Sequence, residues 1–353
     1  MPGSLRYPGN RVCVVLLTGL GDVVNGLPLV NALKDHDPSL HVTWVVEPMP
    51  APVLRPHPSV DEVVVYRKAL GLRGIRELAR ELWRRRYDIT LNLNVYTKSV
   101  WPTFLSRAPH RVGFDRARTF EGVWLAANHH LDPRPRGHTL GMFLEFAEHL
   151  GIPVGEPEWR LAITGEERRE QAEFFAGMDR PVATVVPATA NHRKDWLPDR
   201  WARVVDALER DFGFRVVLLG GRGERETRIV REIMERTRSR PLPAMGGPIR
   251  RIIWMLEGSA LVVAPDTGPL HVARALDVPV VGLYGHTNPW RTGPYRKYRD
   301  LWVDRYTDPG AAPDPSDFTP RRGRMEQITV ADVLDRVARA VEHYGAGRGA
   351  PRA

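Results

Sequence analysis

The stretch RVCVVLLTGLGDVVNGLPLVNALK, residues 11–34, decides the fold. Residues 11–18 form a near-continuous apolar run, which is typical of a parallel strand buried on both faces. Gly19-Leu20-Gly21-Asp22 interrupts this run, and apolar residues then return with helical spacing over residues 23–34. A strand, a turn with two glycines and a helix, in this order, predict the start of a βαβ unit whose turn can approach a ligand closely.

The same alternation continues along the chain. Up to residue 150 it predicts strands at residues 41–46, 62–66 and 87–93 and helices at residues 75–86 and 140–150. The turn-rich segment GIPVGEPEWR, residues 151–160, is interpreted as an interdomain linker. After it the pattern predicts strands at residues 182–186, 214–219, 260–264 and 279–283 and helices at residues 201–212, 226–237, 270–276 and 330–344.

Two successive α/β halves of similar size describe two facing Rossmann-like domains. We expect an N-terminal domain at residues 1–160 and a C-terminal domain at residues 161–345, with a cleft between them. A length of 353 residues also suggests two domains rather than one. Residues 346–353, rich in glycine, arginine and proline, are predicted to form a disordered tail.

The composition narrows the class of protein. A hydrophobic fraction of 42% with 26% charged residues is that of a globular protein. No apolar run approaches the roughly 18 residues needed to span a bilayer, and prolines and glycines interrupt the N-terminal stretch where a signal peptide would be apolar. The single cysteine, Cys13, allows no intrachain disulfide. These features favour a cytoplasmic protein, which we expect to be a monomer.

The chain is basic, with 51 lysines and arginines against 42 acidic residues and a net charge of +9. The basic residues form no aromatic-interleaved stripe and no known nucleic-acid module, so nucleic acid is not the expected partner. Coding bias with solvated arginines is one explanation of the excess, and a phosphorylated substrate is the better functional one. Lysine is scarce in this arginine-rich chain, which draws attention to Lys194.

The segment RKALGLRGIRELARELWRRR, residues 67–86, is amphipathic. It carries Leu72, Ile75, Leu78 and Leu82 on one helical face, with arginines elsewhere. Packing of this face on the sheet is the favoured interpretation. The alternative is contact with an anionic membrane surface or with a phosphorylated lipid acceptor.

Ligands of open parallel sheets bind beyond the carboxyl ends of the strands, so the loops at these ends are the candidate sites. Asp22, in the first such loop, is either a helix N-cap or a general base. The loop after the strand at residues 182–186 carries Thr189 and Lys194. A hydroxyl and a mobile cation suit a diphosphate, although an ordinary solvated loop is the alternative.

Three later loops also follow strands. Gly220-Gly221-Arg222-Gly223-Glu224 resembles a ribose-binding turn, unless Glu224 serves only the dipole of the following helix. In Pro265-Asp266-Thr267-Gly268-Pro269-Leu270-His271, Asp266 or Thr267 can cap a helix whose free N–H groups point at an anion. The third loop, Gly285-His286-Thr287, follows the next strand. Two glycine-containing loops at neighbouring strand ends are more specific than either alone.

Together these loops resemble glycosyltransferase family 9, whose best-known members are the ADP-heptose–lipopolysaccharide heptosyltransferases. The resemblance covers about residues 11–344. It rests on LLTGLGDVVNGLPLVNALK, on HVTWVVEP followed by HPSVDEVVV, on the loop from Thr189 to Trp196, and on APDTGPLHVARALDVPVVGLYGHTNPWRTGPY. The last block is highly specific. The resemblance implies a GT-B fold, in which the N-terminal domain binds the acceptor and the C-terminal domain binds the nucleotide-sugar donor.

The resemblance also implies roles for single residues. Asp22 matches the general base of the family's glycine–Asp motif, beside Gly19 and Gly21. Lys194 and Thr189 match contacts to the donor diphosphate. Glu224 matches a ribose-binding acid, although Arg225 or Glu226 could take that place. The donor loops of the family are matched by Asp266, Thr267, Gly268, Pro269, His271, Gly285 and Thr287. Ala190 and His286 depart from the family pattern, where a second hydroxyl and a proline are common, and this leaves the sugar nucleotide open.

The implied reaction is an inverting displacement at the anomeric carbon, without a metal or other cofactor. It moves a heptose from ADP-heptose to a lipopolysaccharide inner-core acceptor. Asp22 would take the proton of the acceptor hydroxyl, and Lys194 with the helix N-terminus at Thr267 and Gly268 would stabilise the leaving diphosphate. Because the family's acceptor is linked to a lipid, peripheral contact with the cytoplasmic face of the inner membrane is expected.

Other functions remain as alternatives. The chain could use another sugar nucleotide and another glycan acceptor, or it could bind sugar nucleotides without catalysis, which the presence of Asp22 disfavours. A sugar-nucleotide epimerase or phosphorylase is a closer rival. Asp35-His36-Asp37 has the letters of a metal-binding D-x-D motif, but its place before Pro38 indicates the turn that ends a helix. Cys13 is expected in the core, and no Cys/His cluster predicts zinc.

Overall fold

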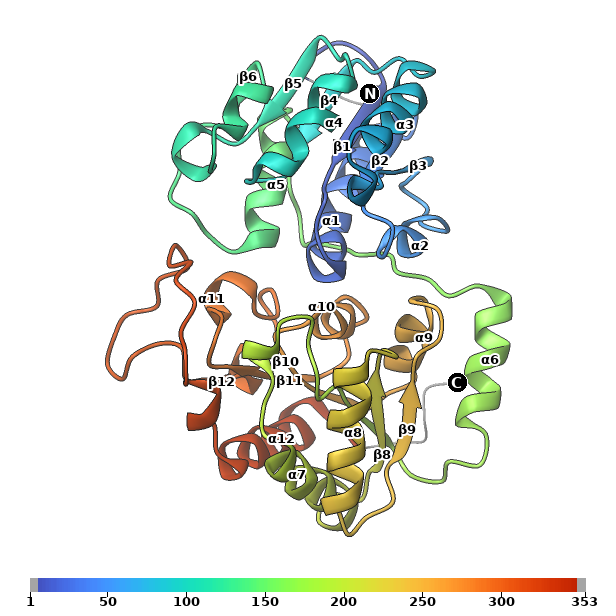
Figure 1. Ribbon diagram of the computed structural model, residues 1–353, viewed down its shortest axis with the longest axis vertical. Helices are drawn as coiled ribbons and strands as arrows, with labels where there is room; N and C mark the ends of the chain where they lie inside the picture. Colours follow the sequence, from blue (N-terminus) through green and yellow to red (C-terminus); the bar gives the residue numbers. More distant parts are fainter. Residues whose placement is uncertain (1–5, 348–353) are drawn as a thin grey trace. The chain divides into compact units, whose positions relative to one another are not determined.

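The computed structural model describes residues 6–347, which divide into two compact units, one ending at Ala162 and the other beginning at Ile163. Each unit contains a six-stranded sheet flanked by helices, and the neighbouring strands pair in parallel (Figure 1). The prediction of two Rossmann-like domains with parallel sheets is therefore confirmed.

The sheet of the first unit has the strand order β3-β2-β1-β4-β5-β6. Its strands are β1 (Arg11–Val15), β2 (His41–Val46), β3 (Glu62–Val65), β4 (Ile89–Asn92), β5 (His110–Gly113) and β6 (His129–His130). Its helices are α1 (Leu20–His36), α2 (Ala51–Leu54), α3 (Gly71–Trp83), α4 (Val100–Leu105) and α5 (Thr139–His149). Helix α1 packs on α5, and α3 packs on α4. Right-handed crossovers put these two pairs on opposite faces of the sheet.

Strand β1 is the centre of this sheet, and its residues after Arg11 are fully buried. It is shorter than the apolar run at residues 11–18 because the buried Asn94 takes over at its end. Asn94 donates a hydrogen bond from Nδ2 to the carbonyl of Val15 at 2.9 Å and accepts one from the N–H of Leu17 at 3.0 Å. Backbone bonds from the Leu16 N–H to the Val45 carbonyl and from the Leu93 N–H to the Val15 carbonyl still join β1 to its neighbours. Beyond them, at Leu17, a side chain takes the place of the neighbouring strand, and the backbone enters the loop that precedes α1.

Helix α1 begins at Leu20, three residues earlier than predicted, with Gly19 as its N-cap. Asp22 therefore lies inside the first turn, and the interpretation of Asp22 as an N-cap is wrong. The helix ends at His36, as the turn interpretation of residues 35–37 requires. Asp35 forms an ion pair with Arg160, with 2.7 Å between Asp35 Oδ2 and Arg160 Nη2.

Helix α3 packs one face on the sheet. Leu78 and Leu82 are buried in a cluster that includes Cys13, and Ile75 packs against it in a partly buried position. The favoured interpretation of residues 67–86 is thus confirmed for these three side chains, but it is wrong for Leu72, which is 72% exposed. Cys13 is a core residue as predicted, and burial raises the pKa of its thiol to about 12.

The sheet of the second unit has the order β12-β11-β10-β7-β8-β9. Its strands are β7 (Val182–Val185), β8 (Arg215–Gly220), β9 (Leu242–Met245), β10 (Leu261–Pro265), β11 (Val280–Tyr284) and β12 (Val303–Asp304). Its helices are α6 (Gly165–Phe175), α7 (Pro198–Arg210), α8 (Glu224–Arg236), α9 (Arg251–Glu257), α10 (Gly268–Ala275), α11 (Pro289–Thr292) and α12 (Val330–Tyr344). Helix α7 packs on α8 and α12, whereas α9 packs on α10 and α6.

The C-terminal helix α12 ends in a cap. Gly345 adopts a left-handed conformation, and the N–H of Ala346 bonds to the carbonyl of Ala340 at 3.1 Å. The predicted tail begins within this cap, where Ala346 is buried, and its residues 348–353 lie outside the described residues. Across residues 6–347, no helix has both the length and the apolar composition that crossing a membrane requires.

Candidate functional site

The strand order of the second unit reverses between β7 and β10. Strands β8 and β9 lie beyond β7 on one side, and β11 and β12 lie beyond β10 on the other. Ligands of doubly wound sheets bind outside the carboxyl ends of the strands at such a reversal. The loop after β7 carries Thr189 and Lys194, and the loop after β10 carries Asp266 and Thr267. The fold therefore brings two of the predicted loops to one edge of the sheet.

An ion pair joins these two loops. The Nζ atom of Lys194 lies 2.7 Å from Oδ2 of Asp266 and also donates to the Asp266 carbonyl at 3.3 Å. The other carboxylate oxygen of Asp266 lies 3.5 Å from Nε2 of His271. Burial of Asp266 opposes its ionisation, but the Lys194 charge and the hydrogen bond and charge of His271 outweigh this, so its pKa lies well below the ordinary value. Asp266 is thus a fixed anion that holds Lys194 in place.

The pair as a whole is electrically neutral. Attraction of a diphosphate must therefore come from directed donors at short range rather than from net charge. A lysine ammonium has three N–H groups, two of which point at Asp266, so one is left to meet a ligand. The side chain of Lys194 keeps 23% of its surface exposed, which leaves that group accessible.

The start of helix α10 supplies further donors. Thr267 is its N-cap, with an extended backbone and no side-chain capping bond, while Asp266 is committed to Lys194 and His271. The prediction that either side chain caps this helix is therefore wrong. Since the N-cap residue makes no side-chain capping bond, the first N–H groups of the helix and its dipole remain available to an anion.

Thr189 braces its own loop. It is 2% exposed, and its hydroxyl donates to the carbonyl of Asn191 at 2.6 Å and lies 3.0 Å from Oδ1 of Asp195. Arg225, in the first turn of α8, binds both Oδ2 of Asp195 and the carbonyl of Thr189. Arg225 thereby clamps the loop after β7 to the start of α8, and the Thr189 proton points into the loop.

The glycine-rich turn after β8 presents two acids in different ways. Glu224 is the first residue of α8 and is exposed, and its side chain has no hydrogen bond or ion pair within residues 6–347. The carboxylate of Glu226 folds back over the turn, where a β-carbon on Gly221 would collide with it. Of the two acids, Glu224 is the one whose carboxylate is free to accept hydrogen bonds from a ribose.

The loop after β11 is tied to a long connection. Nδ1 of His286 donates to the carbonyl of Arg321 at 2.6 Å, which leaves Nε2 to accept from Nδ2 of Asn191 at 3.5 Å. A β-carbon on Gly285 would come within 2.5 Å of the backbone of Arg324 and Met325. The need for glycine at this position therefore comes from the packing of that connection. Thr287, by contrast, makes no side-chain hydrogen bond with any described residue.

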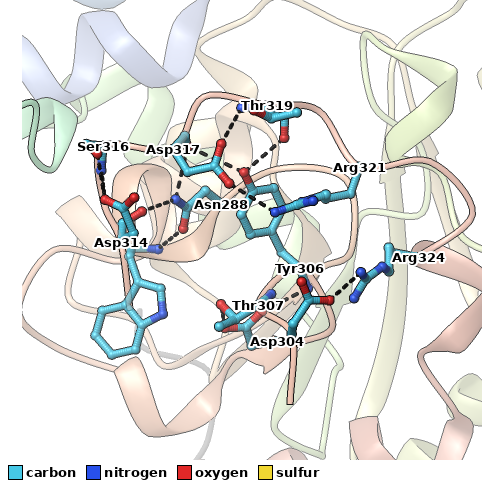
Figure 2. Close-up of polar contacts among 12 residues, drawn as sticks. Asn288, Asp304, Tyr306, Thr307, Asp314, Ser316, Asp317, Thr319, Arg321 and Arg324 are labelled. Atoms are coloured by element: carbon cyan, nitrogen blue, oxygen red, sulfur yellow. Dashed lines mark hydrogen bonds and ion pairs between the residues drawn. The ribbon is translucent and has the colours of Figure 1, made fainter. Parts of the chain in front are cut away.

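The connection itself, residues 305–324, runs from β12 to the short helix η7 (Met325–Gln327) and was not singled out from the sequence. Figure 2 shows its network of side-chain bonds. Asn288 donates from Nδ2 to the carbonyls of Asp314 and Asp317, at 2.7 and 3.1 Å, and the hydroxyl of Tyr306 donates to the carbonyl of Thr319 at 2.9 Å. This 305–324 segment is therefore held in a defined shape beside His286.

Asp22 lies in the first unit, directly after the central strand. It is partly buried in the first turn of α1, and its carboxylate has no hydrogen bond or ion pair with the described part of the chain. The hydroxyl of Thr18, in the same loop, is buried without a partner there. Polar groups without protein partners at the carboxyl end of a central parallel strand make this loop a candidate ligand site. Among residues 6–347, no group of three or more His, Cys, Asp or Glu side chains is arranged to hold a metal.

The comparison with protein families decides the class. The model of glycosyltransferase family 9 (heptosyltransferase) matches residues 75–309, which is more than half of the chain. The chain belongs to glycosyltransferase family 9. It is therefore an enzyme that transfers a sugar.

Individual relatives agree with this family 9 assignment. The lipopolysaccharide core heptosyltransferase OpsX of Haemophilus influenzae is 29% identical over 296 residues, which cover 84% of this chain and 84% of OpsX. A glycosyl transferase family 9 structure from Veillonella parvula has a TM-score of 0.80 at 22% identity, covering 97% of this chain and 100% of that one. E. coli heptosyltransferase WaaC, solved with ADP-2-deoxy-2-fluoro heptose, has a TM-score of 0.73 at 21% identity, covering 93% and 99%. The fold is thus that of known heptosyltransferases.

In this family 9 glycosyltransferase, some of the predicted donor-site residues contact one another and others do not. Lys194, Asp266 and His271 form one connected group, and Thr267 and Gly268 begin the adjoining helix. Thr189 instead belongs to the hydrogen-bond network with Asp195 and Arg225 that holds the loop after β7. Asp195 and Asn288 were not singled out from the sequence. Asn288 caps α11 by accepting the N–H of Trp290, and asparagine just before a proline is a local signal for such a cap. Asp195, by contrast, accepts the N–H of Thr189, six residues earlier, which no local signal predicts.

Proposed function

We propose that this glycosyltransferase moves a heptose from ADP-heptose to a hydroxyl of the lipopolysaccharide inner core, with inversion at the anomeric carbon and without a metal. Membership of family 9 and the similarity to OpsX support the class of reaction. The similarity to WaaC, solved with an ADP-heptose analogue, supports the donor. The observation in this chain that carries the proposal is the Lys194–Asp266 pair at the reversal between β7 and β10.

The second unit, in this proposal, binds the donor. The free N–H of Lys194 and the N-terminus of α10 contact the diphosphate, and Glu224 accepts hydrogen bonds from the ribose. These donors are held in place before the reaction, because Asp266 fixes Lys194 and Arg225 fixes the loop after β7. Fixed donors stabilise the charge that develops on a leaving diphosphate better than mobile ones, and losing one typically raises the barrier by roughly 3–4 kcal/mol.

The first unit, in the same proposal, binds the lipid-linked acceptor and supplies the base. The acceptor oxygen attacks the anomeric carbon from the face opposite the diphosphate and forms the new glycosidic bond. The bond from that carbon to the phosphate oxygen breaks, its electron pair leaves with ADP, and the hydroxyl proton passes to Asp22. The unpaired carboxylate of Asp22 supports this role, which is typically worth about 10²–10⁴ in rate.

Thermal unfolding with ADP, UDP, GDP and CMP at equal, high concentration tests the donor. A ligand at 100 times its dissociation constant stabilises a protein by about 2.7 kcal/mol, which raises the unfolding temperature of a unit of this size by roughly 5–11 °C. A shift confined to ADP, followed by ADP-heptose turnover that yields the inverted anomer in the presence of a chelator, is the expected result. A shift with UDP or GDP would overturn the donor, and the absence of any shift would overturn the donor site.

A further inference from the structure

Exposed apolar side chains gather in the first unit. Of the nine large apolar side chains that are exposed among residues 6–347, eight belong to this unit, and Met234 on α8 is the ninth. The most exposed are Leu72 at 72%, Leu125 at 62% and Trp101 at 55%. Scattered exposed apolar residues are normal on any protein, but such a concentration in one half of a chain marks an interaction surface.

Six of these side chains lie on one outer layer of the sheet. This α3–α4 layer consists of the short helix η1 (Lys68–Leu70), α3, α4 and the short helix η4 (Val123–Ala126). Helix α3 packs on η1 and on α4, which lies beside it in Figure 1, and α4 packs on η4, so the layer is continuous. Its exposed apolar residues are Leu70, Leu72, Trp83, Trp101, Phe104 and Leu125.

The stretch of chain that contains this layer, residues 67–126, carries most of the chain's excess of positive over negative charge. Residues 67–126 contain thirteen basic and five acidic residues, a net charge of +8 out of +9 for the whole chain. Nine of these basic residues are exposed, against one exposed acid, Glu121. Arg76 and Arg80, on the exposed side of α3, have no acidic partner within the described residues. The guanidinium of Arg107 lies 4.0 Å from the ring centroid of Trp83.

Exposed apolar side chains and exposed basic residues together indicate which kind of partner this surface binds. A second copy of the chain would bring two surfaces together that each expose nine basic residues and one acid, which disfavours self-association through this layer. Nucleic acid would bind the arginines and stack on the aromatic rings, but this kind of binding does not account for the exposed Leu72 and Leu125. A bilayer with anionic headgroups accounts for both the basic and the apolar side chains. Arginines attract its phosphates, and leucine and tryptophan side chains enter the boundary between headgroups and acyl chains.

We propose that the α3–α4 layer docks on an anionic phospholipid bilayer, with Leu72, Trp101 and Leu125 inserted at the headgroup boundary. This surface extends beyond residues 67–86 to α4 and η4, which the sequence pattern did not include. It is independent of the donor assigned above, because it contains none of the residues placed at either candidate site.

Sedimentation of the full chain with vesicles tests the proposal. Wild type is expected to sediment with phosphatidylcholine vesicles that contain phosphatidylglycerol, to bind less as salt is raised, and to remain in solution with phosphatidylcholine alone. The triple variant Leu72→Gln/Trp101→Gln/Leu125→Gln is expected to bind the anionic vesicles about tenfold more weakly or worse. Arg76→Gln/Arg80→Gln should also weaken binding, through the electrostatic contribution.

Met234→Gln is the matched control, because it removes an exposed apolar side chain from the second unit and should leave vesicle binding unchanged. The substituted side chains are exposed, so unfolding temperatures equal to wild type are expected to show that each variant folds. Equal binding of wild type and the triple variant would overturn the proposal, as would failure of wild type to sediment. A concentration-dependent dimer that the triple variant loses would assign the surface to a second copy instead. None of these readouts uses a sugar nucleotide, so they stand apart from the test of the donor.

Discussion

The Nζ atom of Lys194 lies 2.7 Å from Oδ2 of Asp266, and this pair connects the loops after β7 and β10 where the strand order of the second unit reverses. The carboxylate is buried, with 6% of its side chain exposed, whereas 23% of the lysine side chain is exposed. A buried carboxylate is costly to desolvate, so such a pair adds little net stability. Its effect is to place one cation at the edge of the sheet before any ligand arrives.

Substitution of Lys194 by methionine should reveal how strongly the buried carboxylate depends on its partner. The variant keeps the apolar stem but leaves Asp266 with His271 alone, and removing one member of a buried pair typically costs about 3–5 kcal/mol. We expect the free energy of unfolding, measured in urea, to fall by this amount. Affinity for ADP should also fall, because the diphosphate loses a charged donor.

Lys34→Met is the matched control for this experiment. Lys34 pairs with Asp61 at 2.8 Å, and the two side chains are 16% and 31% exposed. Its lysine is therefore more buried than Lys194, but its carboxylate is far more exposed than Asp266. Pairs with an exposed member typically contribute about 0–1 kcal/mol, so the control should lose little stability. Equal losses in the two variants would contradict the importance of the buried carboxylate.

The lowered pKa of Asp266 predicts a pH dependence of stability. An unfolded Asp titrates near about 3.9, so between that pH and the lower folded pKa the unfolded chain binds a proton that the folded chain does not. The contribution of this group is thus fully present above about pH 5 and is lost progressively as the pH falls from about 3.9 toward the lower folded pKa. Unfolding free energies of wild type and Asp266→Asn should differ most at neutral pH and converge in acid. A constant difference across this range would show that ionisation of Asp266 is not involved.

The central elements could be predicted because their patterns are strong. Strands β1, β7, β10 and β11 are buried apolar runs in the middle of each sheet, and glycine or proline marks the turns beside them. The edge strands β6 and β12 have two residues each, which is too short for any periodicity. Helix α6 was missed because it is mostly charged, although Thr164 and Glu167 form a capping box that the sequence shows.

The candidate site was predicted as a set of loops but not as a network. Neighbouring strand ends follow from the alternation of strands and helices, so Lys194 and Asp266 could be expected at one edge. The clamp of Arg225 on Asp195 and Thr189 depends on side-chain directions across some thirty residues of sequence, which no local pattern contains. The same holds for His286, whose partner Arg321 lies on the 305–324 segment.

Asn288 should control the order of the 305–324 segment. Its amide holds the carbonyls of Asp314 and Asp317, and its Oδ1 accepts the N–H of Trp290 at the start of α11. Asn288→Ala removes these three hydrogen bonds, each typically worth about 0.5–1.5 kcal/mol, and leaves the two carbonyls only the longer bonds from the Asp317 N–H at 3.2 Å and the Tyr306 hydroxyl at 3.4 Å. Hydrogen exchange at residues 312–319 should become faster. Ser316→Ala, at an exposed position of the same segment, is the control and should leave exchange elsewhere in the segment unchanged.

Asp22→Asn tests the proposed base without disturbing the donor site. The amide keeps the size of the carboxylate but cannot accept a proton, and proton transfer of this kind is typically worth about 10²–10⁴ in rate. We expect kcat with ADP-heptose and acceptor to fall by more than about tenfold, while the affinity for ADP stays close to that of wild type. Steady-state kinetics and nucleotide titration of the same preparation measure both quantities.

Asp35→Asn is the control for this prediction, since Asp35 lies on the same helix and its ion pair with Arg160 is largely exposed. A change at Asp35 alters the net charge of the chain by the same amount, so an effect of net charge alone would appear in both variants, although the helix dipole acts with opposite sign at the two ends of α1. Loss of turnover in Asp22→Asn alone would assign the proton transfer to that carboxylate. Normal turnover in Asp22→Asn would remove Asp22 from the mechanism, and the unpaired Thr18 hydroxyl in the same loop would then mark an acceptor contact without a base.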